Sequence, residues 1–214
     1  PIDRNPDYLV YMDDFTGVAL DNTNDWTVVK DSSASAAIAA DVVNGAVTLS
    51  SQATTDNDGA SIQGNEIFAV ATTRDIWFET KITPTDAEGD AMDICIGLTV
   101  NFATNPEAML TAADRIVFQV DDGDSNIDCV TEKDGTATTT DSGVDIASGT
   151  AVTLGFHVKG TGKVEFFVNR NLVATHTANI PDDENLALGA MELSGSATGT
   201  KSMNIDYMFA AQNR

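Results

Sequence analysis

The stretch Gly149–Thr177, GTAVTLGFHVKGTGKVEFFVNRNLVATHT, determines the fold class of this chain. Apolar residues occupy every second position of its first part, which is the pattern of a half-buried strand: Val152, Leu154, Phe156 and Val158. Lys159–Gly162 then supplies two glycines for a turn, and Asn169–Asn171 supplies asparagines that tolerate the left-handed backbone of a tight hairpin. The stretch therefore predicts three consecutive antiparallel strands.

Working outward, the rest of the chain predicts about a dozen short strands and at most one short helix. The helix is expected after Asn105, which can cap it, with Pro106 in its first turn and an end near Ala113. Val42–Leu49 is predicted to be a hairpin around Asn-Gly, preceded by an irregular edge or loop over Asp31–Ala40. We expect a leading arm over residues 1–11 and a single domain over residues 12–214, since no repeat or linker interrupts the pattern.

Three segments carry a family resemblance. The hairpin that ends in Leu172–Thr177 (LVATHT) resembles the laminin-G-like or pentraxin-like hairpin of the concanavalin A-like lectin/glucanase sandwiches. Met12–Gly17 (MDDFTG) is similar to the opening of that superfamily, and Met203–Met208 (MNIDYM) is similar to its closing strand. The resemblance implies an all-β, concanavalin A-like jelly-roll sandwich of two antiparallel sheets. The superfamily includes lectins, hydrolases and virion proteins, so the resemblance leaves function open.

Composition limits the function classes. Hydrophobic residues make up 42% of the chain, which is enough for a core. The 11 Lys and Arg residues against 33 Asp and Glu residues give a net charge of −22, which disfavours nucleic acid and anionic lipid as partners. No apolar run is long enough for a transmembrane helix, so we expect no membrane insertion. Pro1–Asn5 lacks a signal-peptide pattern, which favours synthesis in the cytoplasm, although a trimmed secreted protein would look the same.

Catalytic residues are not expected. Hydrolases of the superfamily use a Glu-x-Asp-x-x-Glu strand motif that aims carboxyl groups into one cleft, and a retaining glycosidase needs two such groups about 5 Å apart. The nearest match, Glu88–Asp93 (EGDAMD), departs at the last position and begins in a predicted turn. We therefore expect an acidic, solvated turn here and a protein that is not an enzyme.

Metal binding has one main candidate, with Asp56–Gly59 as a comparable but shorter cluster. Asp122, Asp124 and Asn126 present alternating oxygen ligands that could hold calcium, but the EF-hand pattern fails at Ile127 and Lys133. Ordinary turn chemistry explains the same residues, so the expectation is no cofactor, with calcium as the alternative.

Cys95 and Cys129 are the only cysteines. They are expected to be two unpaired, partly buried thiols, and a disulfide between neighbouring strands is the alternative. His157 and His176 are expected on adjacent strands as surface or sheet-face residues, because no motif places a nucleophile near them.

Aromatic residues supply the remaining candidates. Trp77 alternates with the apolar residues Ile76 and Phe78, so it lies on the opposite sheet face, where it could stack on a sugar ring. Core packing is the competing interpretation for Trp77 and for Trp26. Tyr8 and Tyr11, in the predicted arm, could anchor a partner subunit.

Together these features favour a non-enzymatic virion surface protein of a tailed phage, made in the host cytoplasm. Its expected partners are capsid or other virion proteins and further copies of itself, with host surface glycans as additional ligands. The alternatives are a free, secreted carbohydrate-binding lectin-like module and a divergent glycoside hydrolase.

Overall fold

The stretch Gly149–Thr177 forms the three strands that its alternating pattern predicts. In this computed structural model, which describes residues 6–31, 33–51, 55–85, 92–102, 104–195 and 201–214, the stretch becomes β11 (Val152–Lys159), β12 (Lys163–Val168) and β13 (Asn171–His176). Alternate positions of β11 and β12 are buried, and the positions between them, Phe167 included, are partly exposed. Asn169 and Arg170 take positive φ values of 50° and 66°, so the tight hairpin between β12 and β13 is confirmed.

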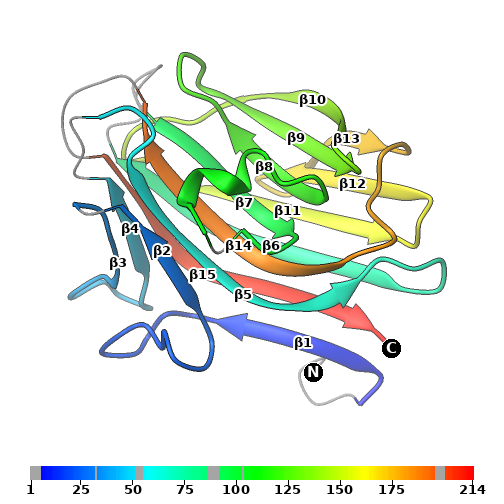
Figure 1. Cartoon of the computed structure of the whole chain (residues 1–214), viewed down its shortest axis with the longest axis horizontal. Helices are drawn as coiled ribbons and strands as arrows, with labels where there is room; N and C mark the ends of the chain where they lie inside the picture. Colours follow the sequence, from blue (N-terminus) through cyan, green and yellow to red (C-terminus); the bar gives the residue numbers. More distant parts are fainter. Residues whose placement is uncertain (1–5, 32, 52–54, 86–91, 103, 196–200) are drawn as a thin grey trace.

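Two antiparallel sheets pack face to face (Figure 1). The eight-stranded sheet contains, in spatial order, β13, β12, β11, β6 (Asp75–Thr85), β15 (Lys201–Asn213), β4 (Val47–Ser51) and β3 (Ser35–Ile38), with β1 (Tyr8–Asp13) also paired to β15. The seven-stranded sheet contains β10 (Thr136–Asp145), β9 (Asn126–Lys133), β8 (Arg115–Val120), β7 (Met92–Thr99), β14 (Asn185–Ser194), β5 (Gly59–Ala69) and β2 (Thr27–Lys30). This is the expected all-β jelly-roll sandwich.

The core lies between the sheets and is anchored by aromatic side chains. Phe78 and Phe156, on neighbouring strands of the eight-stranded sheet, stack with ring centroids 4.7 Å apart. Phe118 of the opposite sheet meets Phe166 edge to face at 5.4 Å. Because all four rings are buried, they join the two sheets through one apolar cluster.

Two local expectations need correction. The helix begins as predicted, with the Asn105 side chain accepting a hydrogen bond from the Glu107 backbone N–H, but it is only a 3-10 turn, η2 (Pro106–Met109). The hairpin before β4 has its first strand at β3, inside the segment expected to be irregular, because Ser35–Ile38 pairs with Val47–Ser50. Val42 and Val43 instead lie exposed in the loop that connects β3 to β4.

Residues 8–11 of the predicted leading arm belong to a sheet. They form most of β1, which pairs with the last part of β15. Among the described residues, no helix is long and apolar enough to cross a bilayer.

Candidate functional site

The outer face of the eight-stranded sheet carries a row of rings. Trp77 of β6 and His157 of β11 are cross-strand partners, and their rings stack with centroids 4.9 Å apart and planes 20° apart. The ring of Tyr8 in β1 is tilted by 53° relative to the Trp77 ring, and the two ring centroids are 6.1 Å apart. A 3.2 Å contact between His157 Nε2 and the Asp75 carboxylate orients the imidazole. Trp77 is therefore held between two rings on the solvent side of the sheet and does not pack in the core.

Beside this row the sheet is hollowed. Gly155 of β11 pairs with Phe167 on one side and Glu79 on the other, and Glu79 in turn pairs with Phe209 of β15. Gly155 lacks a side chain and Ala211 has a small one, so the sheet surface at these two positions is lower than at the large residues around them. The resulting groove has a volume of about 450 Å³, within the range of small-molecule sites. Its rim residues include Tyr8, Trp77, Glu79, Phe167, Arg170 and Phe209.

A bulge in β15 places a tyrosine beside Glu79, one of the residues that line the groove. The pairing between β15 and β6 shifts by one residue between Ile205 and Tyr207. As a result, the Tyr207 hydroxyl donates a 2.6 Å hydrogen bond to Glu79 Oε1. The pKa of Tyr207 is raised above its ordinary value, first by burial and then by this hydrogen bond and the Glu79 charge. Tyr207 therefore stays protonated and fixes the Glu79 carboxylate.

The lysines on this face are paired. Lys81 binds Asp206 at 2.8 Å, while Lys159 and Lys163 bind the two oxygens of Glu165 at 2.7 and 2.8 Å. Hydrogen bonds from these two lysines lower the pKa of Glu165 to about 2. The charges around the groove are thus largely compensated by one another.

The two tyrosines predicted to dock a partner have different environments. Tyr8 lines the groove. Tyr11 packs edge to face on Trp26 at 5.6 Å, and burial, followed by the Asp13 charge, raises its pKa. Trp26 is itself buried and donates a hydrogen bond from Nε1 to Asp13 Oδ2 at 2.8 Å. Docking by these tyrosines stays a prediction.

The calcium candidate lies in the turn before β9. Asp124 accepts hydrogen bonds from the backbone N–H of Asn126 at 3.1 Å and from its side-chain amide at 3.2 Å. The Asp122 backbone N–H donates to Asp93. In the described part of the chain, no three His, Cys, Asp or Glu side chains gather in a way that could hold a metal ion. Calcium binding by Asp122, Asp124 and Asn126 stays a prediction.

The acidic run considered for catalysis is only partly described. Residues 88–91 lie outside the described residues. Asp93 lies in β7 of the seven-stranded sheet, where burial raises the pKa of its carboxyl group to about 6.

The outer face of the seven-stranded sheet is covered at its centre. Side chains from the η2 segment and from the sheet form a second apolar cluster there. Its buried members are Cys95, Phe102, Met109, Val117, Val130, Met191 and Leu193. The absence of a side chain at Gly189 leaves room for Phe102, because a Cβ at that position would lie 2.7 Å from the Phe102 ring. The central strands of this sheet therefore present no open apolar surface in the described structure.

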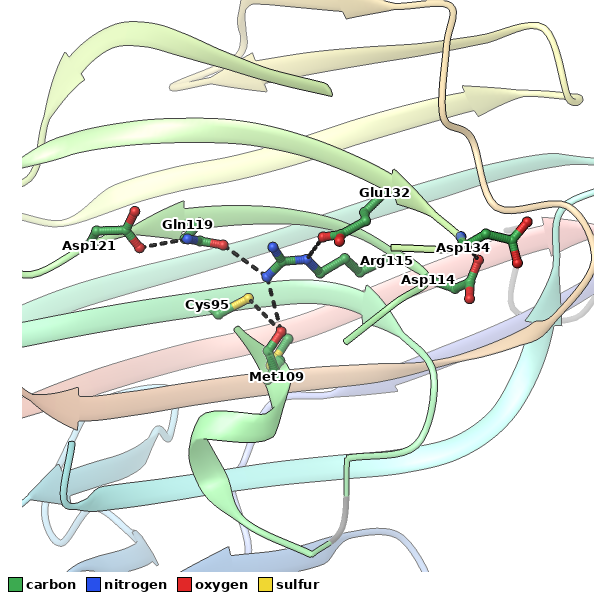
Figure 2. Close-up of polar contacts among 8 residues, drawn as sticks. All are labelled: Cys95, Met109, Asp114, Arg115, Gln119, Asp121, Glu132 and Asp134. Carbon is green, nitrogen blue, oxygen red and sulfur yellow. Dashed lines mark hydrogen bonds and ion pairs between the residues drawn. The ribbon is translucent and has the colours of Figure 1, made fainter. Parts of the chain in front are cut away.

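A buried ion pair between Arg115 and Glu132 links the η2 segment to the sheet (Figure 2). Arg115 Nε donates to Glu132 Oε2 at 2.7 Å, and its Nη1 donates to the Met109 carbonyl at 3.1 Å and to Gln119 Oε1 at 2.9 Å. Gln119 then donates to Asp121 at 2.6 Å. This network satisfies the Met109 carbonyl at the end of η2 and has a structural role.

Cys95 and Cys129 lie on opposite faces of this sheet, since Cys95 belongs to the outer cluster and Cys129 to the inter-sheet core. Both thiols are free, and burial raises the pKa of each to about 12.

The prediction for the histidines was wrong in two respects. His157 and His176 are separated by β12, and His176 is buried between hydroxyl groups of Thr131 and Thr140, each 3.0 Å away.

Sequence reasoning singled out Trp77, Tyr8 and His157 separately but did not predict that they share one groove. Alternation places Glu79 with Trp77, and Gly155 with His157, on one face of each strand, but it does not show that the two strands are neighbours. Phe209 and Tyr207 were hidden because the bulge in β15 breaks its alternation. Nothing in the sequence around Arg170 indicated a binding role, because the residue was recognised only as part of a turn.

Comparison with known proteins identifies the fold. No protein-family model matches the sequence, and no curated protein matches it. Among solved structures, an endo-1,3-beta-glucanase from Streptomyces sioyaensis is similar, with a TM-score of 0.67, 11% identity and 98% of each chain covered. The beta-glucanase of Bacillus licheniformis has a TM-score of 0.65 and 13% identity, covering 94% of this chain and 97% of that one. A protein of unknown function from Shewanella oneidensis MR-1 has a TM-score of 0.66 and 16% identity, covering 96% of this chain and 87% of that one.

Identities this low establish the architecture alone. The chain therefore has the concanavalin A-like jelly-roll fold that these glucanases share.

Proposed function

We propose that this protein binds carbohydrate without cleaving it, through the groove on the outer face of the eight-stranded sheet. The observation that carries the proposal is the hollow over Gly155 and Ala211, bordered by Trp77, Phe167 and Phe209 and supplied with a fixed carboxylate at Glu79. The similar glucanases support the proposal as analogy only.

The groove suits the chemistry of a sugar. A pyranose ring has apolar C–H faces that pack on aromatic rings, and hydroxyl groups at its edge that need hydrogen-bond partners. The aromatic border supplies the first contact. The Glu79 carboxylate, already oriented by Tyr207, supplies an acceptor for the second.

The arrangement of carboxyl groups supports binding over hydrolysis. A glycosidase needs two carboxyl groups about 5 to 9.5 Å apart. Among the described residues that line the groove, Glu79 has the only carboxyl group. Asp75 shares its strand face, but four residues of extended chain separate their Cα atoms by about 13 Å. The Asp206 carboxylate is held by Lys81.

The test is binding to an oligosaccharide panel, with any positive glycan then titrated calorimetrically. Trp77→Ala should weaken binding at least about tenfold, because it removes a ring from the site. Ile67→Ala, an exposed position on the other sheet, should bind like the wild type. No new reducing ends should form on prolonged incubation. Absence of binding to every glycan, or equal binding by Trp77→Ala, would refute the proposal.

Attachment to a tailed-phage virion is a second proposal, favoured by a separate surface feature. Val18 and Val43 are 106% and 84% exposed, and Val18 and Val42 border a hollow formed by two loops. Exposed aliphatic groups that gather in this way are typical of association surfaces. Under this proposal the loop end docks on the particle while the groove faces host glycans. Sizing the protein alone and in its source particle tests it, and a monomer absent from particles would contradict it.

A further inference from the structure

Among the described residues, Arg170 is a cation at the groove for which no ion pair is found. Each lysine on the outer face of β6, β11 and β12 binds a carboxylate there, as the pairs of Lys81, Lys159 and Lys163 show. Arg170 also lines the groove, yet no carboxylate of the described residues lies within ion-pair distance of it. Its five N–H donors are therefore available to a ligand.

The backbone holds Arg170 in place. The turn is fastened to β11, because the Asn169 backbone N–H donates to the Thr153 carbonyl at 2.7 Å and the Asn169 side chain accepts from the Thr153 backbone N–H at 3.1 Å. Asn171 adds a hydrogen bond to the Asn169 carbonyl at 3.3 Å. Arg170 itself has a φ of 66°, which is unfavourable for a residue with a long side chain. A pinned, strained turn presents the guanidinium at the groove, where an asparagine or glycine would satisfy the backbone more easily.

We propose that the groove takes a carboxylate-bearing sugar, a hexuronate within an oligosaccharide, whose carboxylate binds Arg170. This inference rests on the proposed function and specifies its ligand. Guanidinium binds carboxylate in a planar, two-point geometry, which makes it selective for that group. The hydroxyl groups of the same sugar face Glu79, and its ring packs on the aromatic border.

The overall charge sets a limit on this ligand. A net charge of −22 repels polyanions at long range. The repulsion is screened beyond roughly 8 to 10 Å at moderate ionic strength, and Asp206 and Glu165 on this face are each neutralised by lysines. One carboxylate at Arg170 is thus favoured, while a long polyuronate gains little from its additional charges.

The test compares two probes that differ only in their three carboxylates: trigalacturonate and its carboxyl-reduced counterpart, trigalactose. Titration calorimetry should show the wild type binding trigalacturonate at least about tenfold more tightly. Arg170→Gln should reduce this preference to about one. Lys30→Gln, which removes the same charge from a strand of the other sheet, should keep the preference. Arg170→Asn, which suits the positive φ, provides a second variant if Arg170→Gln folds poorly.

The outcomes separate the two proposals. Equal affinity of the wild type for both probes, or a preference that survives in Arg170→Gln and Arg170→Asn, overturns the role of Arg170. In that case, trigalactose binding that is lost in Trp77→Ala still supports carbohydrate binding in the groove. If neither probe binds, the hexuronate inference is overturned, and the wider oligosaccharide panel decides the proposed function by itself.

Discussion

Glu192 is a carboxyl group buried between the sheets, and its replacement gives a quantitative test of the structure. It lies on β14 with an exposed fraction of 0%. Ser51 of the opposite sheet donates a 2.8 Å hydrogen bond to its Oε1. Its Oε2 has no hydrogen-bond partner among the described residues. Burial, with a smaller contribution from the Asp93 charge, raises the pKa of Glu192 from 4.5 to about 7.

The direction of the pH effect follows from the raised pKa. The native state holds the Glu192 proton more tightly than the unfolded chain does, so the free energy of unfolding falls as pH rises from about 4.5 to about 7. At about 1.4 kcal/mol per pH unit, the full loss is about 3.4 kcal/mol, of which about 2.5 kcal/mol falls between pH 5 and pH 8. Glu192→Gln keeps an acceptor for Ser51 and removes this titration.

Urea unfolding followed by tryptophan fluorescence, at pH 5 and pH 8, measures the effect. Relative to the wild type, Glu192→Gln should gain about 2.5 kcal/mol more stability at pH 8 than at pH 5. This difference is independent of any constant effect of the new amide group. Glu184→Gln, at an exposed position, serves as the matched control. If the stability difference between Glu192→Gln and wild type is the same at both pH values, Glu192 does not titrate as a buried group.

Two further tests, each with a control substitution, concern the packing of the seven-stranded sheet. Gly97→Ala should cost at least about 2 kcal/mol, because Gly97 has a φ of 151° and a Cβ there would lie 2.4 Å from the Ile116 carbonyl oxygen. Gly123→Ala, at a φ of 85° in open space, should cost only about 1 kcal/mol, and equal losses in thermal unfolding would contradict the close approach of β7 and β8. Arg115→Met should cost about 3 kcal/mol by leaving Glu132 buried without its partner, whereas Lys81→Met at a partly exposed pair should cost less than about 1 kcal/mol. Adding Glu132→Leu to Arg115→Met should restore part of the loss in urea unfolding, and a further loss would show that the pair does not act as a unit.

The sequence by itself determined the fold class, because the signals involved are local. The alternation in β11 and β12 and the asparagines of the hairpin act within a few residues, so they predicted strand, turn and buried face correctly. The η2 segment was harder to predict. Its cap was readable from Asn105, but its length was set by packing on β14 and β5.

Strand β3 was missed for a related reason. Ser35–Ile38 has little apolar character of its own, and it becomes a strand because β4 offers an unpaired edge. Val42 and Val43 looked like the better strand but lie exposed in the loop. In both segments, pairing with β4 decided which residues form the strand, against the strand propensity of the residues themselves.

Only the tertiary structure decided the candidate site. The groove joins Tyr8, Trp77, Gly155 and Phe209, which belong to four strands far apart in the chain. Whether a small residue sits beside a large one depends on cross-strand register, and the bulge near Tyr207 shifts that register by one residue. Sequence fixes which face a side chain takes along its own strand, but the neighbours of that side chain are chosen by the pairing of distant strands. This is why Trp77 could be singled out from the sequence, while Arg170 and the hollow beside it could not.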